Sequence, residues 1–394
     1  MTYIRTNFAT KQDHMRIVHA VRQFHPSVGG LENVVMELAR AQIERGHNLR
    51  IVTLDRIFDV AGRERLATRE KISGIEIIRI PFYGSRRYPV APSVLKHIGD
   101  TDILHVHAID FFFDFLAWTK PLHRRPLVAS THGAFFHTSF AATLKRLYFR
   151  TVTRLSAACY DAVVAVSPAD HDLFSSISSN VVCIENGVNI RRFLAAGASS
   201  PRKRIVAIGR FSSNKRLDRL ISCFAELRAC DPDWSLVIAG RASDLTASDL
   251  MSLAVRAGVG NCVSTVESPS DDELRRIVHE CSVVASASDY EGFGLAAVEG
   301  MAAGLFPLLS DIPPYRRLVA GTGVGMIVDF SDPAGAAGNF LQRWAEVTKS
   351  YGQMRSAAIE AARNYEWGPV AAKYLQLYES VLAQRTQPHI RPAR

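Results

Sequence analysis

Short apolar runs alternate with longer amphipathic segments along the whole 394-residue chain. Each run covers about four to seven residues, a length typical of a strand that is buried on both faces of a sheet. Parallel strands need crossover connections, and the segments between the runs are long enough to be helices. The alternation therefore predicts an α/β protein built on parallel sheets.

The apolar runs form two series. The first lies at residues 16–21, 49–54, 75–81, 103–107, 127–131, 162–166 and 181–184, and the second at residues 204–208, 235–239, 262–266, 283–286, 306–309 and 325–328. The Ala-, Gly-, Ser- and Pro-rich stretch at 193–204 separates them. We therefore expect two doubly wound, Rossmann-like domains over residues 1–195 and 196–369, followed by a C-terminal helix and tail over 370–394 that packs back on the first domain.

The charge of the chain is uneven. The net charge is +9, and +8 of it falls within residues 1–195, which suggests an anionic partner for the first domain. Nucleic acid is not expected, because basic runs do not interleave with stacking aromatics and a helix-turn-helix pattern is absent from the sequence. The first fifteen residues lack the apolar core of a secretory signal, and the composition has no membrane span. A cytoplasmic protein is expected.

Gly29 and Gly30 stand between the first apolar run and the next helical segment. Bare amides at a helix start can approach an anion closely, although a plain tight turn explains the pair equally well. A dinucleotide-binding fingerprint would need G-x-G-x-x-G and an acidic residue at the end of the next strand. Only the glycine pair is present, so a dehydrogenase is not expected.

Arg210 and Lys215 leave the end of the first run of the second series, just before a helical segment. Two cations beside a helix N-terminus can hold a diphosphate and neutralise a leaving phosphate. A solvated loop with two charges is the alternative.

The segment at 289–300, DYEGFGLAAVEG, is the sharpest signal in the chain. Its glycines expose backbone amides where a helix begins, and Glu291 and Glu299 lie at the two ends of the motif. A carboxylate on such a helix suits ribose hydroxyls through paired hydrogen bonds. A helix-capping acid and a surface glutamate are the alternative.

With this segment the chain resembles the family 4 glycosyltransferases, whose motif carries two glutamates eight positions apart. Other pieces agree in order and spacing: GGLE at 29–32, STHG at 130–133, VAVSP at 164–168, ENGVN at 185–189 and GRFSSNK at 209–215. The resemblance runs from about residue 15 to 383 and implies the GT-B fold, with its two domains facing across a cleft. Two departures exist: Asn189 stands where the usual pattern has Asp, and Pro313-Pro314 replaces small residues. Neither removes a charge on which the expected site depends.

Within the family, residues 21–26 and 310–315 are similar to the α-mannosyltransferases of bacterial exopolysaccharide assembly. Those enzymes transfer mannose from GDP-mannose to cellobiosyl-diphosphopolyprenol. The resemblance therefore implies a retaining hexosyltransferase with a nucleotide-sugar donor and a polyprenyl-diphosphate-linked acceptor.

The resemblance also implies roles for matching residues. Gly29 and Gly30 would give amides to the diphosphate or sugar, and His132 would contact the transferred hexose. Arg210 and Lys215 would grip the diphosphate.

In the glutamate motif, Glu291 would contact the hexose and Glu299 would hold the ribose. The amides of Phe293, Gly294 and Leu295 would lie nearby. The expected catalytic set is His132, Glu291, Arg210 and Lys215.

No metal or other cofactor is expected. His105 and His107 point to one face of a strand, but a metal would need a third ligand, so we expect buried or cleft-lining histidines. Asp231 and Asp233 resemble a D-x-D motif at the amino end of a strand, away from the cleft, and are read as a turn. Arg210, Lys215 and helix dipoles would supply the positive charge instead.

Two alternatives stay open for the function. A nucleotide-sugar epimerase of the same fold would expel and return the nucleotide, releasing UDP and hexosamine without an acceptor. A non-catalytic nucleotide-sugar-binding protein would typically lose a phosphate-gripping cation or one glutamate of the motif. For the mechanism, front-face transfer is favoured over double displacement through Glu291.

The last expectation is peripheral docking of the first domain on the inner face of the cell membrane. The arginines Arg146, Arg150 and Arg154 recur every four residues and predict one basic helical stripe. The aromatic segment at 109–118 would reach the interface beside it. Core aromatics with a solvated arginine face are the alternative.

Overall fold

The computed structural model describes residues 14–27, 29–58, 65–86, 88–132 and 146–386. The chain forms two compact units, one of residues 1–186 with 370–394 and one of residues 187–369. The change of unit falls before the expected boundary after residue 195. Val188 and Ile190 pack with α10 (Leu295–Ala303) of the second unit, and Phe193 belongs to another core cluster of that unit.

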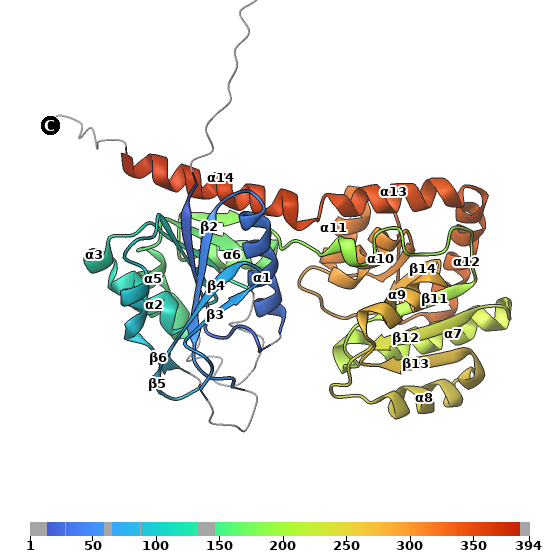
Figure 1. Ribbon diagram of the computed structural model, residues 1–394. Helices are drawn as coiled ribbons and strands as arrows, with labels where there is room; N and C mark the ends of the chain where they lie inside the picture. The colour runs from blue at the N-terminus through green and yellow to red at the C-terminus, as the bar shows by residue number, and fades with distance from the viewer. Residues whose placement is uncertain (1–13, 28, 59–64, 87, 133–145, 387–394) are drawn as a thin grey trace, which may run out of the picture. The chain divides into compact units, whose positions relative to one another are not determined.

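The first unit is built on an eight-stranded sheet (Figure 1). Its order is β10 (Val181–Cys183), β9 (Ala162–Ala165), β8 (Leu127–Ser130), β7 (Ile103–His107), β1 (Arg16–Ala20), β2 (Asn48–Leu54), β4 (Ile75–Ile80) and β3 (Arg69–Ile72). All neighbours are parallel except β3, which pairs antiparallel with β4. The seven expected strands are present. β3 was not predicted, because its exposed sequence REKI has no apolar run.

Helices cover both faces of this sheet (Figure 1). They are α1 (Gly30–Ile43), η1 (Pro92–His97), α2 (Phe111–Trp118), α3 (Lys120–His123), the π-helical turn η2 (Phe149–Thr153), α5 (Arg154–Ala157), α6 (Pro168–Ser175) and α14 (Trp367–Thr386), which belongs to this unit from Val370 onward. A small hairpin joins β5 (Tyr83–Gly84) and β6 (Pro89–Val90).

Most of helix α2 belongs to the core, although Trp118 at its end is 57% exposed. Asp110 caps its start by accepting from the Phe112 amide at 2.9 Å, and Phe111, Phe112 and Phe113 are all buried. They pack with β1, β2, β4 and β7 in one cluster. The expectation that these three rings reach a membrane interface was therefore wrong, since they fill the face of the sheet that α2 covers.

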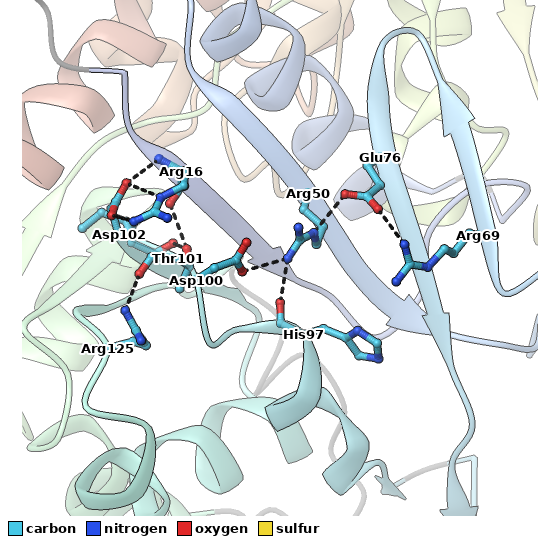
Figure 2. Close-up of polar contacts among 10 residues, drawn as sticks. Arg16, Arg50, Arg69, Glu76, His97, Asp100, Thr101, Asp102 and Arg125 are labelled. Carbon is cyan, nitrogen blue, oxygen red and sulfur yellow. Dashed lines mark hydrogen bonds and ion pairs between the residues drawn. The ribbon is translucent and has the colours of Figure 1, made fainter.

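Ion pairs tie together the amino ends of the central strands of this unit (Figure 2). Arg16 Nη2 lies 2.8 Å from Asp102 Oδ1, and Arg50 lies 3.0 Å from both Glu76 and Asp100. These cations are neutralised by carboxylates from neighbouring strand ends. Because the pairs are partly exposed, each contributes little to stability, and their main effect is to align the strand ends.

The second unit has a six-stranded parallel sheet with the order β13 (Val263–Glu267), β12 (Ser235–Gly240), β11 (Arg204–Ile208), β14 (Val283–Ser286), β15 (Phe306–Ser310) and β16 (Met326–Val328). Its helices are η3 (Ile190–Arg192), η4 (Ser213–Lys215), α7 (Leu217–Cys230), α8 (Ala247–Arg256), η5 (Gly260–Cys262), α9 (Asp271–His279), α10 (Leu295–Ala303), α11 (Pro313–Thr322), α12 (Pro333–Lys349) and α13 (Tyr351–Arg363). Separate core clusters lie on the two faces of the sheet. All six strands were predicted.

Within the described residues, no helix combines the length and apolar character needed to cross a bilayer. Two doubly wound α/β units with parallel sheets are thus confirmed as the architecture. In both sheets the carboxyl ends of the strands are where a ligand site is expected.

Candidate functional site

Glu291 and Lys215 form an ion pair at the carboxyl ends of β11 and β14. Lys215 Nζ lies 2.5 Å from Glu291 Oε1. The same oxygen accepts from Ser288 Oγ at 2.7 Å and from Tyr315 Oη at 3.3 Å. Lys215 and Ser288 thus hold this carboxylate oxygen, and Tyr315, whose hydroxyl also lies 2.7 Å from Ser286 Oγ, gives it a weaker third contact.

Backbone geometry brings Lys215 to this place. Lys215 ends the short helix η4 and its side chain passes over Gly209, where a Cβ would come within 3.2 Å of Lys215 Cε. The residue after Gly209, Arg210, is exposed and lines one small hollow together with Lys215 and Ser286. Among the described residues no ion pair holds Arg210. The two cations predicted to grip a diphosphate thus line the same hollow, and one of them is unneutralised.

Helix α10 begins four residues after Glu291, and its cap is a glycine that the fold requires. Gly294 caps the helix in the left-handed region, with φ at 87°, and a Cβ there would lie 2.6 Å from Tyr315 Cε1. Leu295 is the first helical residue and is exposed, while Phe293 packs against Tyr365. Free amides at the first turn of α10 carry the positive end of the helix dipole, which favours an anion.

Glu299 lies further along α10 and is partly buried. Burial raises the pKa of its carboxyl group to about 7, and the Arg192 charge opposes that rise. Arg192 is itself paired with Asp271 at 2.6 Å. Glu299 is therefore partly protonated at neutral pH, and a ligand with hydroxyl donors would stabilise its ionised form.

In the first unit, Gly29 and Gly30 stand at the start of α1. Gly29 caps the helix in an extended conformation, and a Cβ there would meet Glu32 Oε2 at 2.5 Å. Space around Gly30 is open. Buried Arg79 fixes the preceding loop by donating to the His25 carbonyl at 2.6 Å. The loop before α1 is thus fixed in place, and the two glycines at the helix start present backbone without side chains of their own.

His132 follows β8 in a left-handed conformation with φ at 51°. Its Nε2 lies 2.9 Å from Nδ1 of His107, which is fully buried on β7. Burial lowers the pKa of His132 to about 3, so the imidazole is neutral at physiological pH. Gly133, the last residue of the STHG motif, lies outside the described residues.

His107 belongs to a cluster that the sequence only half predicted. His105 and His107 were expected to be buried or cleft-lining, and both are fully buried. His19 on β1, the register partner of His105, joins them, and the ligand atoms of the three rings lie within 4.8 Å of one another. The third histidine needed for a metal is therefore present, and it was missed because sequence spacing does not report which strands are neighbours.

Asp231 and Asp233 lie at the amino end of β12, as predicted. Both carboxylates contact Lys203 Nζ, at 2.9 and 3.0 Å. They form a paired turn before the strand and do not approach the carboxyl ends where the other candidate residues gather.

The three arginines of the predicted basic stripe are all exposed. Arg150 lies in η2 and Arg154 begins α5, while Arg146 stands in the helical turn before η2. Leu147 and Leu155, which directly follow Arg146 and Arg154, are 59% and 66% exposed. The surface therefore mixes basic and apolar side chains, although its apolar members are these leucines and not the phenylalanines of α2.

Sequence reasoning missed several polar residues around the predicted ones. Ser288 and Tyr315 form hydrogen bonds with Glu291. Ser288 could have been predicted as a partner, because it stands three residues before the glutamate. Gln42 on α1 and Tyr378 on α14 bond the histidine cluster. No pattern in the sequence connects them to a histidine.

Comparisons with known proteins agree with this geometry. The family model for glycosyl transferases group 1 matches residues 193–364, and that for glycosyltransferase family 4 matches residues 28–192. The chain is 43% identical to a GDP-mannose:cellobiosyl-diphosphopolyprenol alpha-mannosyltransferase of Komagataeibacter xylinus, over 94% of each chain. It is 42% identical to the protein of that name from Xanthomonas campestris, over 96% of this chain and all of the relative.

Solved structures share the fold at low identity. Sucrose-phosphate synthase from Thermosynechococcus elongatus has a TM-score of 0.69 and 18% identity, covering 94% of this chain and 100% of that one. HepE from Anabaena, in complex with UDP and glucose, has a TM-score of 0.68 and 19% identity, covering 93% and 100%. With the two family models and the close relatives, these likenesses confirm the GT-B fold: the chain belongs to the family 4 glycosyltransferases.

Proposed function

We propose that this protein transfers an α-mannosyl group from GDP-mannose to a cellobiosyl-diphosphopolyprenol acceptor. The observation that carries the proposal is the identity of 42–43% over nearly the whole chain to relatives bearing that name. The glutamate motif and both expected cations are present at the carboxyl ends of the second sheet, which agrees with a nucleotide-sugar donor.

In this proposal the second unit stabilises the leaving nucleotide. Lys215 and Arg210 contact the diphosphate, and the amides of Phe293, Gly294 and Leu295 complete the anion site. These groups neutralise the charge that develops on the β-phosphate as the glycosidic bond breaks. Because two cations and a helix dipole supply that charge, the reaction needs no metal ion.

Other residues recognise the sugars of the donor. Glu299 accepts from the ribose hydroxyls, and Glu291 and His132 contact the mannose. Gly29 and Gly30 give amides to the diphosphate or the sugar.

Retention proceeds by front-face transfer, in which a phosphate oxygen assists deprotonation of the acceptor hydroxyl. The contacts of Glu291 support this choice over double displacement. Its Oε1 atom already accepts from Lys215, Ser288 and Tyr315. A carboxylate oxygen that already accepts hydrogen bonds from a cation and a hydroxyl is a weakened nucleophile.

The acceptor is lipid-linked, so the enzyme works at the cytoplasmic face of the membrane as a peripheral protein. Exposed Arg146, Arg150 and Arg154 give the first unit a basic surface, with Leu147 and Leu155 as apolar contacts. Each Lys or Arg near an anionic surface contributes about 1 kcal/mol, so three hold the protein reversibly. Cosedimentation with anionic vesicles at low salt should be lost in the triple Arg→Ala variant; equal binding would refute this surface.

A screen of nucleotide release tests the reaction itself. GDP-mannose with the lipid-linked cellobiose acceptor should release GDP, whereas UDP-glucose and GDP-mannose without acceptor should release little. Release of UDP with free hexosamine in the absence of acceptor would favour the epimerase. Binding without turnover of any donor would favour a non-catalytic protein.

A further inference from the structure

We propose that Gln42 fixes the tautomer of His132 through His19 and His107, so that His132 presents Nδ1 as a hydrogen-bond acceptor to a hydroxyl of the donor sugar. The sugar contact rests on the proposed function. The tautomer does not, and it can be measured without any substrate.

A continuous path of hydrogen bonds joins Gln42 to His132. Gln42 Oε1 on α1 lies 2.9 Å from His19 Nε2, and His19 Nδ1 lies 2.8 Å from His107 Nε2. His107 Nδ1 lies 2.9 Å from His132 Nε2. Gln42, His19 and His107 are buried, so water does not interrupt the path.

The hydrogen bonds along this path all donate in the direction from His132 to Gln42. A neutral imidazole has one donor nitrogen and one acceptor nitrogen, and an amide oxygen only accepts. His19 must therefore donate from Nε2 to Gln42 and accept at Nδ1. His107 then donates from Nε2 and accepts at Nδ1, and His132 donates from Nε2. The Nδ1 atom of His132 is left as an acceptor.

Burial keeps each ring in the neutral state that this direction requires. It lowers the pKa of His19 to about 4, and the pKa values of His105 and His107 fall well below their ordinary value because of burial and repulsion among the rings. A charged imidazole would have two donors and would break the path at its partner.

A second set of contacts agrees with the same orientation of Gln42. Its Nε2 lies 3.4 Å from Tyr378 Oη, which in turn lies 2.6 Å from His105 Nδ1. His105 Nε2 lies 2.8 Å from Ser130 Oγ. Gln42 can donate to Tyr378, Tyr378 to His105, and His105 to Ser130. One amide orientation thus satisfies both arms, and reversing it would reverse both.

The same contacts argue against a metal ion among these rings. All six ring nitrogens of His19, His105 and His107 have hydrogen-bond partners. A bound metal would have to take at least three of them.

The test is the ¹⁵N spectrum of the histidine rings in the full-length protein. Long-range ¹⁵N–¹H correlations distinguish a protonated ring nitrogen from an unprotonated one, and a His132→Gln variant assigns the His132 signals. We expect a proton on Nε2 and none on Nδ1. A proton on Nδ1 in the wild-type protein overturns the proposal without any further variant.

Two variants then locate the cause. Gln42→Met removes the amide but keeps the volume, and the His132 tautomers should mix. Tyr378→Phe disturbs the other arm of the same buried cluster, and the His132 tautomer should be unchanged. An unchanged tautomer in Gln42→Met, or a stoichiometric metal in the purified protein, would refute the role of Gln42.

Kinetics separate the tautomer from the sugar contact. Gln42→Met should raise KM for GDP-mannose about fivefold, the typical effect of one hydrogen bond, with kcat little changed. Mixed tautomers with an unchanged KM would refute the contact to the sugar. Absence of mannosyl transfer in the wild type would refute the proposed function and leave the measured tautomer standing.

Discussion

The two units place their candidate residues at equivalent ends of similar sheets but differ in charge. In the first unit a chain of buried, neutral histidines ends at His132. In the second, Lys215, Glu291 and exposed Arg210 put full charges at the carboxyl ends of β11 and β14. The difference fits two tasks, because sugar hydroxyls need fixed neutral acceptors and donors, whereas a leaving phosphate needs cations.

The amino ends of the first sheet provide a second contrast. There the cations Arg16 and Arg50 are matched by neighbouring carboxylates (Figure 2). Charge that is paired on a strand end serves alignment, and charge left exposed beside a helix start, as at Arg210, remains available to an anion.

Removal of the lysine charge should have the largest effect. Lys215→Ala should lower kcat/KM by about 10²-fold or more, on the order of 3 kcal/mol, because a charge-assisted contact to the leaving group is lost. Lys203→Ala is the matched control, since Lys203 pairs with Asp231 and Asp233 at the amino end of β12. If the activity of Lys215→Ala lies within threefold of wild type, the assignment of Lys215 to the leaving phosphate is wrong.

The first unit should lose stability in mild acid. The folded pKa of His19 is about 4 against about 6.5 unfolded, so the unfolded state binds more protons between these values. The contribution of neutral His19 to the free energy of unfolding is fully present above pH 6.5. It falls as the pH approaches 4, by on the order of 3 kcal/mol for His19 alone. Hydrogen exchange of β1 and β7 amides measures this.

The stability of the second unit should change with pH in the opposite direction, because of Glu299. Its folded pKa is about 7 against 4.5 unfolded, so its stabilising term is present below pH 4.5 and is lost as pH rises through 7. If β14 and β7 amides show the same pH dependence of exchange, the electrostatic contrast between the units is wrong.

Donor affinity should rise with pH because ribose hydroxyls favour the ionised Glu299. With a pKa of about 7, the affinity for GDP-mannose should increase by at most about tenfold from pH 6 to pH 8. Calorimetric titration measures the change, and the phosphates of GDP-mannose do not titrate in this range. Glu299→Gln should bind more weakly at pH 8 and show a flat profile; a rising profile in that variant would assign the effect to another group.

Chelation should have the smallest effect. Activity should persist in excess EDTA, because Arg210, Lys215 and the start of α10 supply the positive charge. Total loss that is restored by Mg²⁺ or Mn²⁺ would mean that a carboxylate pair serves a metal and that the charge contrast is incomplete.

Strand positions were predictable from sequence, and the candidate residues of the second unit could be chosen from local motifs. Apolar runs report burial directly, and in 289–300 the motif is local, so Glu291, Gly294 and Glu299 could be read together. The contact of Tyr315 with Glu291 depends on packing between α11 and the end of β14, and Tyr315 was therefore missed.

The histidine cluster of the first unit and its partners were harder to predict because they are far apart in the chain. Gln42 and Tyr378 are separated by 336 positions, yet they lie within hydrogen-bond distance. Burial of Phe111–Phe113 likewise depends on which face of the sheet α2 covers. A run of aromatic residues in the sequence does not by itself distinguish a buried segment from a surface segment.

The most direct test of the central claim is the structure of the product. Incubation with GDP-α-mannose and cellobiosyl-diphosphopolyprenol, followed by mass spectrometry and NMR of the released oligosaccharide, should identify one added mannose in α linkage. A β-linked mannose would contradict retention. A hexose added only from a UDP-sugar, with GDP-mannose inert, would contradict the donor assignment on which the proposed function depends.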